Sequence, residues 1–206
     1  MIGFLMRKSE YKFIVLLSLF LITIWFIDLP ANENVGSAVM VVSAHPLASE
    51  VGNEILKSGG NAIDAAVASA LAIGVVEPNG SGLGGGGAML IYLREPDSLT
   101  YINYYVSAPA SIAPDFSSRR ESASARSVLV PGTVAGLSYA LKKYGTITWQ
   151  ELLNRVIQKV EQGFVVSELF YQAILESYDK LLQYPQTRAI YFVNDLPPEI
   201  GTRLAN

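Results

Sequence analysis

The chain has 206 residues, half of them apolar and only 16% charged, so intrinsic disorder of the whole chain is excluded. Its formal net charge of −3 argues against a nucleic-acid partner, because nucleic-acid-binding proteins need a basic face. The absence of cysteine excludes disulfides, thiolate metal sites and cysteine nucleophiles, and the single histidine, His45, nearly excludes a histidine-rich metal site or a conventional Ser-His-Asp triad. We therefore expect neither a metal nor a cofactor.

The N-terminal thirty residues have the pattern of an export signal. Arg7, Lys8 and Lys12 precede an unbroken apolar run over residues 13–27, which ends at Asp28. As a helix this run would reach about 22 Å, short of the roughly 30 Å hydrocarbon core of a bilayer. Its length therefore lies between that of a signal-peptide core and that of a membrane anchor.

Both forms of export signal give the same localisation for the rest of the chain. Positive charge before the run and acidic residues after it place residues 31–206 on the extracytoplasmic side of the membrane. We predict that residues 1–30 are a signal anchor or a signal peptide, with residues 13–27 as an N-terminal hydrophobic helix in the membrane. A buried core helix is the remaining alternative, although Trp25 and Phe26 would then lie close to a basic cluster.

Beyond the signal, the pattern predicts a short strand and two helices. Residues 39–43 are mostly β-branched and predict a buried strand. A helix should begin at Pro46 and end at the Gly59-Gly60 pair. Asn61 is a good N-cap for a second helix, with Asp64 three residues later to complement the exposed amides. Because that second helix is apolar on every side through Val76 yet too short to cross a membrane, it belongs in a protein core.

A glycine-rich segment and a hairpin follow. Residues 88–93 and 99–106 predict two strands joined by a turn over residues 95–98. Residues 114–127, rich in serine and arginine, predict a solvated loop.

Three more helices complete the pattern. The first should run from Pro131 to Gly145 with Val134, Leu137 and Leu141 on one face. Thr148 and Glu151 form a capping-box pattern for the second, which ends near Gly163. The third should run from Ser167 to Tyr184-Pro185 as one helix. Strands bracketing buried and amphipathic helices indicate an α/β or α+β fold.

Two motifs could carry chemistry. The glycines over residues 82–87 satisfy GxGxxG, but the order here is helix, loop, strand, whereas a dinucleotide site needs strand, loop, helix. The glycines could let a neighbouring segment pass close by, or they could face a ligand. His45 lies where a strand would meet a helix; it could be a general base, but no orienting group accompanies it and Ser43 or Ser49, which favours a polar junction residue.

Five sequence blocks, taken in order, resemble the γ-glutamyltransferases (glutathione hydrolases) and the related capsule poly-γ-glutamate depolymerases. The blocks are SAHPLA (43–48), GGNAIDAAVASALAIGVVEP (59–78), SGLGGGGAMLIY (81–92), VPGTVAGLSYALKKYG (130–145) and, more loosely, GFVVS (163–167).

The resemblance implies an N-terminal nucleophile hydrolase with an α+β fold, a four-layer αββα sandwich of which this chain holds part. Such proteins are made as precursors that cut themselves into a large and a small subunit. The new N-terminal threonine of the small subunit attacks a γ-glutamyl amide, with its own amine as base, and passes the acyl group to water or an amino acid. On this resemblance, residues 31–206 are the N-terminal portion of a large subunit, an incomplete domain that expects the small subunit as its partner.

The chain departs from the family pattern in two places. The family's cut precedes a Thr-Thr-His run, and no two of the chain's seven threonines are adjacent. The resemblance also implies an Arg-Glu-x-Ala-Pro motif whose arginine grips the α-carboxylate of the γ-glutamyl group. Alignment on Ala108-Pro109 places Tyr105 and Val106 at the arginine and glutamate positions. Tyr105 could donate one hydrogen bond to substrate there, or it could be an ordinary strand aromatic like Tyr101.

Two hypotheses for function follow. In the first, the complete protein is an enzyme that cleaves or transfers γ-glutamyl groups of glutathione or poly-γ-glutamate, and this chain is inactive alone because it lacks the catalytic threonine. In the second, the chain is a non-catalytic, surface-anchored remnant or binding scaffold.

Overall fold

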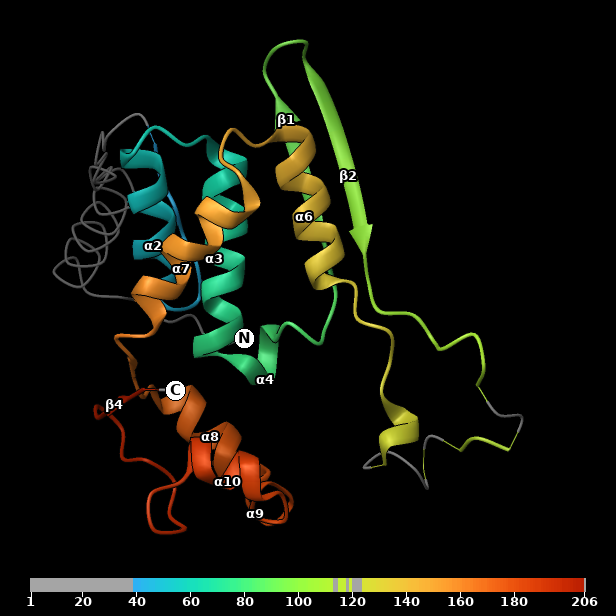
Figure 1. Ribbon diagram of the computed structural model, residues 1–206, viewed down its shortest axis with the longest axis vertical. Coiled ribbons are helices and arrows are strands. Elements are labelled where there is room, and N and C mark those ends of the chain that lie inside the picture. Colours follow the sequence, from blue (N-terminus) through green and yellow to red (C-terminus); the bar gives the residue numbers. More distant parts are fainter. Residues whose placement is uncertain (1–38, 113–114, 118, 120–123, 206) are drawn as a thin grey trace, which may run out of the picture. The chain divides into compact units, whose positions relative to one another are not determined.

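The computed structural model describes residues 39–112, 115–117, 119 and 124–205 (Figure 1). The chain from Met40 onward forms one compact unit. Its elements, in chain order, are α2 (Pro46–Lys57), α3 (Ala62–Val76), α4 (Pro78–Ser81), β1 (Gly87–Leu93), β2 (Ser98–Tyr104), the 3-10 turn η1 (Ala125–Ser127), α6 (Thr133–Tyr144), α7 (Trp149–Val160), β3 (Phe164–Val165), α8 (Glu168–Glu176), α9 (Tyr178–Leu182), α10 (Pro185–Tyr191) and β4 (Arg203–Leu204). The predicted mixture of helix and sheet is confirmed.

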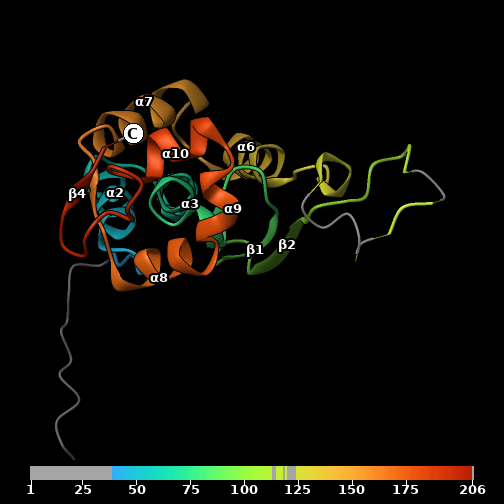
Figure 2. The same cartoon turned by 90° about the horizontal axis from the view of Figure 1, so that it is seen from below.

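The α3 helix is the centre of the main core. It begins at the predicted cap, where the Asn61 side chain accepts hydrogen bonds from the amides of Ile63 and Asp64 and the Asp64 carboxylate accepts one from the Asn61 amide. The α2, α6 and α7 helices all contact it, and Figure 2 shows α3 end-on with its neighbours around it. Because its alanines are small, these helices can approach closely and bury an all-apolar segment without lipid.

The predicted strand over residues 39–43 is wrong. None of residues 39–43 belongs to a strand of the structure. Val41 packs against the core, whereas Met40 and Val42 are 74% and 83% exposed. High β-propensity alone does not form a strand, because a strand is stabilised by its ladder partner and by burial of its face.

The predicted hairpin is confirmed. The strands β1 and β2 pair antiparallel from Gly87↔Tyr104 to Leu93↔Ser98, two residues short of the predicted end at Val106. Side chains alternate between the two faces. One face packs against the core through Met89, Ile91, Ile102 and Tyr104, and α6 lies against β2 on this side (Figure 1).

The helices α6 and α7 follow the prediction closely. The Thr148 hydroxyl caps α7 by accepting a hydrogen bond from the Glu151 amide at 3.2 Å, and Gly163 after the helix has a φ of +77°. Within α6, Leu137 and Leu141 are buried, whereas Val134 is 47% exposed. In the first turn of α6, Thr133 and Gly136 make up the buried stripe in its place.

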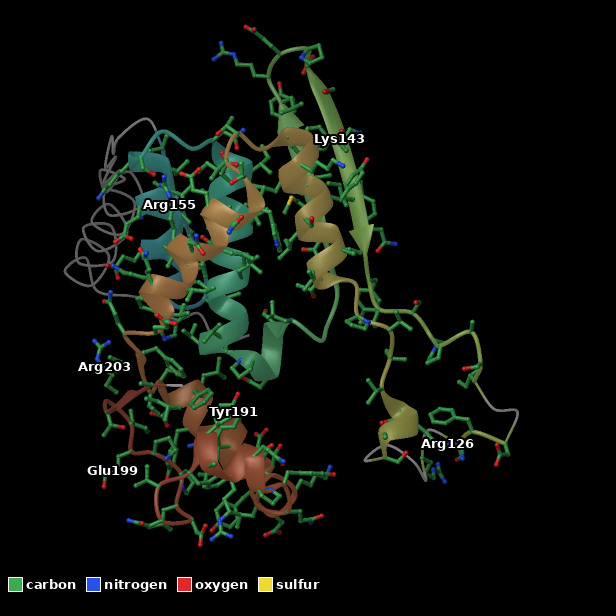
Figure 3. The ribbon with its side chains drawn as sticks, viewed as in Figure 1. Arg126, Lys143, Arg155, Tyr191, Glu199 and Arg203 are labelled. Carbon is green, nitrogen blue, oxygen red and sulfur yellow. The ribbon has the colours of Figure 1, made fainter. Side chains whose placement is uncertain are left out.

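The C-terminal part differs most from the prediction. Residues 168–182 form two short helices, α8 and α9, separated at Ser177. Pro185 was expected to stop a helix, but it begins α10, where its missing amide and fixed φ suit the first turn. The two-residue strands β3 and β4 pair nearby, and Arg203 donates to the carbonyls of Gln162 and Gly163, both at 2.8 Å (Figure 3).

Two sequence predictions fall wholly or partly outside the described residues. The signal segment 1–30, with its hydrophobic helix over residues 13–27, lies outside them, and the loop 114–127 is described only in part. Within the described ranges, no helix combines the length and hydrophobicity needed to cross a bilayer.

Candidate functional site

Three segments converge at the glycine-rich loop. The Gly85 carbonyl accepts hydrogen bonds from the amides of Gly132 (2.9 Å) and Thr133 (3.2 Å), so the loop caps the N-terminus of α6. Ser107 and Val130 exchange two backbone hydrogen bonds of 3.2 and 2.9 Å, which join the segment after β2 to the segment before α6. The loop, the end of β2 and the entry to α6 therefore form one hydrogen-bonded junction.

The glycines at this junction permit close backbone contact. A Cβ atom at Gly86 would lie 2.5 Å from the Val106 nitrogen, and one at Gly132 would lie 2.0 Å from the Tyr104 carbonyl oxygen. Both distances are shorter than any real side chain tolerates, so these positions need glycine. The interpretation that the motif lets a neighbouring segment pass close by is confirmed at Gly86. By contrast, Gly80 and Gly84 have open space where a Cβ would be.

Tyr105 lies at this junction and is 72% exposed. Its amide donates to the Asn103 side-chain oxygen at 3.0 Å, which holds the backbone just after β2. The preceding residue, Tyr104, is turned the other way: it packs against the core, and burial raises the pKa of its phenol. The structure therefore separates the two tyrosines by face and leaves the Tyr105 side chain accessible to a ligand.

His45 is part of a helix cap. Its Nδ1 accepts a hydrogen bond from the Leu47 amide at 3.1 Å at the start of α2, and its ring packs edge-on against Phe164. The Ser43 and Ser49 hydroxyls lie 2.7 Å apart, and Ser43 also donates to the His45 carbonyl. Because Nδ1 is occupied by a backbone amide and neither serine hydrogen bonds to the ring, the junction interpretation is confirmed over the general-base alternative.

A buried carboxylate connects the start of α3 with the α6–α7 connection. Besides capping α3, Asp64 accepts hydrogen bonds from the Thr146 hydroxyl (2.6 Å), the Thr146 amide (2.9 Å) and the Ile147 amide (3.3 Å). Burial raises the pKa of Asp64, but these hydrogen bonds outweigh that effect and lower it from its ordinary value of 3.8. The cap was predictable from sequence, whereas the contact with Thr146, 82 residues away, was not.

These features do not form a catalytic constellation. Among the described residues, no group of three or more His, Asp or Glu side chains could hold a metal ion. In this region, Tyr105 combines an accessible polar side chain with a predicted substrate contact. The exposure of the side chain is observed, and the contact with substrate stays a prediction.

Comparison with known proteins assigns the chain to a family. Residues 48–206 match the family model described as Gamma-glutamyltranspeptidase. The glutathione hydrolase proenzyme of Bacillus subtilis (strain 168) is 40% identical over 182 residues, covering 83% of this chain and 30% of the relative. The capsule biosynthesis protein CapD proenzyme of Bacillus anthracis is 35% identical over 164 residues, covering 80% of this chain and 29% of CapD. The chain thus spans under a third of the length of these relatives.

Solved structures agree with this assignment. The crystal structure of Helicobacter pylori gamma-glutamyltranspeptidase matches with a TM-score of 0.75 and 31% identity, covering 82% of this chain and 51% of that one. Bacillus anthracis CapD matches with a TM-score of 0.68 and 34% identity, covering 82% and 54% of the two chains. The chain belongs to the gamma-glutamyltranspeptidase family.

Proposed function

We propose that this chain is large-subunit scaffold of an enzyme that cleaves or transfers γ-glutamyl groups, from glutathione or poly-γ-glutamate. The observation that carries the proposal is the continuous family match over residues 48–206, supported by the fold match to Helicobacter pylori gamma-glutamyltranspeptidase. The relatives named as glutathione hydrolase and CapD support the two substrate classes.

The reactive group of the proposed enzyme is not among these residues. In the mechanism that family membership suggests, a threonine hydroxyl attacks the amide carbonyl while the threonine's own amine takes the proton, and the amine of the substrate leaves. Water or an amino acid then attacks the resulting ester and frees the threonine. The 206 residues contain no Thr-Thr-His run, so this threonine must come with the small subunit, which is the partner that we propose.

The outer face of the hairpin supports a sandwich fold for the complete protein. Four large side chains on this face are 63–66% exposed: Leu90, Tyr92, Leu99 and Tyr101. Strands that face water on one side normally carry polar residues there, whereas strands buried on both faces are apolar throughout. We infer that a second sheet from the rest of the protein covers this face, which gives the αββα layers expected from the family resemblance.

We also propose that the complete protein is anchored in the membrane with its folded part outside the cytoplasm. The support is the sequence pattern of residues 1–30, in which basic residues precede the apolar run over 13–27. Protease treatment of intact cells tests this topology. Digestion of the folded part without lysis is expected, and protection until lysis would contradict it.

A chimera tests the proposed enzymatic function. Residues 39–206 replace the matching segment in the Bacillus subtilis glutathione hydrolase proenzyme, and release of p-nitroaniline from γ-glutamyl-p-nitroanilide is measured. We expect the precursor to cut itself and to release p-nitroaniline, and the matched chimera with the relative's nucleophilic threonine replaced by alanine to do neither.

The same chimera separates this function from the non-catalytic alternative. A chimera that folds and cuts itself yet releases no p-nitroaniline, also after Tyr105→Arg, would contradict the proposed function and favour a remnant or binding scaffold.

A further inference from the structure

A pocket of about 240 Å³ lies between the start of α4 and the C-terminal helices α8, α9 and α10. Its lining is largely apolar and includes Phe170, Ile174 and Leu181. Phe170 and Tyr191 meet edge to face with ring centroids 6.0 Å apart, so two aromatic rings border the space. The pocket lining shares no residue with the glycine-loop junction described above.

The residues that line this pocket include none with a charged side chain. A carboxylate or an ammonium group would find no opposite charge in this lining, which therefore favours a neutral occupant.

Three polar side chains at the pocket have no hydrogen-bond partner among the described residues: Asn79, Ser177 and Tyr191. The Ser177 hydroxyl lies at the N-terminus of α9 but does not cap it. Tyr191, which is labelled in Figure 3, is half-buried, and burial raises the pKa of its phenol. Ser177 and Tyr191 are partly buried, and partly buried polar groups are normally paired, so both are available to a ligand in the pocket, whereas Asn79 is exposed to solvent.

The volume of the pocket limits the size of its occupant. An engineered apolar cavity of about 150 Å³ binds benzene, and sites for drug-sized ligands are about 300–1,000 Å³. A pocket of about 240 Å³ lies between these values. It fits one aromatic ring with a short substituent.

We propose that this pocket binds a small neutral aromatic molecule, one ring carrying a hydroxyl or carbonyl group that pairs with Tyr191, Ser177 or Asn79. The ring lies against Phe170, Ile174 and Leu181, where edge-to-face aromatic contact and apolar burial favour it. The polar substituent then pairs with one of the three polar side chains of the lining.

NMR titration of the full 206-residue chain with benzyl alcohol, at a concentration below that at which the chain associates, tests this site. We expect saturable shifts of Ala173, Ile174 and Leu181 with a Kd on the order of 1 mM, because a ligand of about eight heavy atoms has limited affinity. Benzoate, which has the same ring but a negative charge, should bind at least about tenfold more weakly.

Three variants separate this site from unspecific binding. Ala173→Leu fills the half-buried lining and should abolish the saturable shifts, whereas Ala189→Leu, the same change at an exposed position of α10, should leave them unchanged. Tyr191→Phe keeps the ring but removes the hydroxyl. It should weaken the binding of benzyl alcohol by about 3–10-fold, as the loss of one hydrogen bond predicts, and leave the binding of toluene unchanged. The amide spectrum of each variant shows whether it is folded.

Three results would overturn the proposal. These are the absence of saturable shifts in the chain with native residues, retention of the shifts in folded Ala173→Leu, and benzoate binding as tight as that of benzyl alcohol.

Discussion

Asp64 stabilises two parts of the fold at once. Its carboxylate is fully buried and accepts hydrogen bonds from the Asn61 amide, the Thr146 hydroxyl and amide, and the Ile147 amide. A buried carboxylate without a cationic partner is tolerated only when donors surround it, as they do here. This residue therefore holds the start of α3 against the connection between α6 and α7.

Replacement of Asp64 tests this role. Asp64→Asn places an NH2 group opposite backbone amides, so we expect the free energy of unfolding to fall by about 2–4 kcal/mol. Thr146→Val removes only the hydroxyl hydrogen bond and should cost about 1–2 kcal/mol, whereas Thr146→Ser should cost less. Urea unfolding followed by circular dichroism measures all three. Equal stability of Asp64→Asn and the chain with native residues would contradict this account.

Acid should weaken the same interaction. The folded-state pKa of Asp64 lies below the ordinary value of 3.8, so its contribution is complete above the unfolded-state pKa and is lost as pH falls through the folded-state pKa. We expect the stability difference between the native chain and Asp64→Asn to be constant from pH 7 to about 5 and to shrink below about pH 4. A stability difference that grows on acidification would show that folding raises the pKa of Asp64 and does not lower it.

Tyr105 is the position at which substrate recognition is predicted to depart from the family pattern. Its exposure and its place beside the glycine loop allow contact with a ligand. A bidentate guanidinium–carboxylate pair is stronger than a single phenol hydrogen bond by about 1–2 kcal/mol. In the chimera, Tyr105→Arg should lower the KM for γ-glutamyl-p-nitroanilide by about 5–30-fold, and Tyr184→Arg, at an exposed position before α10, serves as the control. An unchanged KM would show that Tyr105 does not face the donor.

At the scale of elements, the sequence correctly predicts those helices whose ends are set by capping residues at the helix itself. The α3 helix begins at the predicted cap formed by Asn61 and Asp64. The α7 helix begins at Thr148, whose side chain accepts from the Glu151 amide, and Gly163 follows its end. The strand over residues 39–43 failed because strand formation needs a partner that no local pattern reveals. The apolar spacing of residues 167–184 predicts one helix because it continues through Ser177, but the backbone of the structure leaves the helical region at that residue.

The candidate site was predictable only in outline. Sequence located the glycine loop and Tyr105, but the loop's contact with α6 joins Gly85 to Gly132 and Thr133, far apart in the chain. The pocket beside α10 could not be anticipated, because it depends on the break at Ser177 and on a helix that begins at Pro185.

The close packing of α6 on β2 depends on Gly136, which has no side chain. A Cβ at Gly136 would lie 2.2 Å from the Tyr104 Cβ and Cγ atoms. Alanine favours helix by about 1 kcal/mol over glycine, but this clash outweighs that gain, so we expect Gly136→Ala to destabilise the chain by about 1–3 kcal/mol. Gly84→Ala, which meets open space, is the matched control and should be neutral. Thermal unfolding compares them, and a higher Tm for Gly136→Ala would contradict the packing.

At the scale of the whole molecule, the hairpin's outer face should make the isolated chain associate. Its four exposed apolar side chains adjoin strand edges that have no partner among the described residues. We expect concentration-dependent association in sedimentation experiments and its reduction by the pair Leu90→Lys and Tyr101→Lys. Leu169→Lys, at an exposed position of α8, should have little effect. A native chain that stays monomeric and melts cooperatively would refute this expectation.

The central claim is that these residues provide scaffold and that the reactive threonine comes with another part of the protein. The most direct measurement is p-nitroaniline release from γ-glutamyl-p-nitroanilide by the purified 206-residue chain alone. We predict a rate equal to that of buffer, because no threonine here belongs to a Thr-Thr-His run. Release that co-purifies with the chain, and that disappears when one of its own residues is replaced, would contradict the claim.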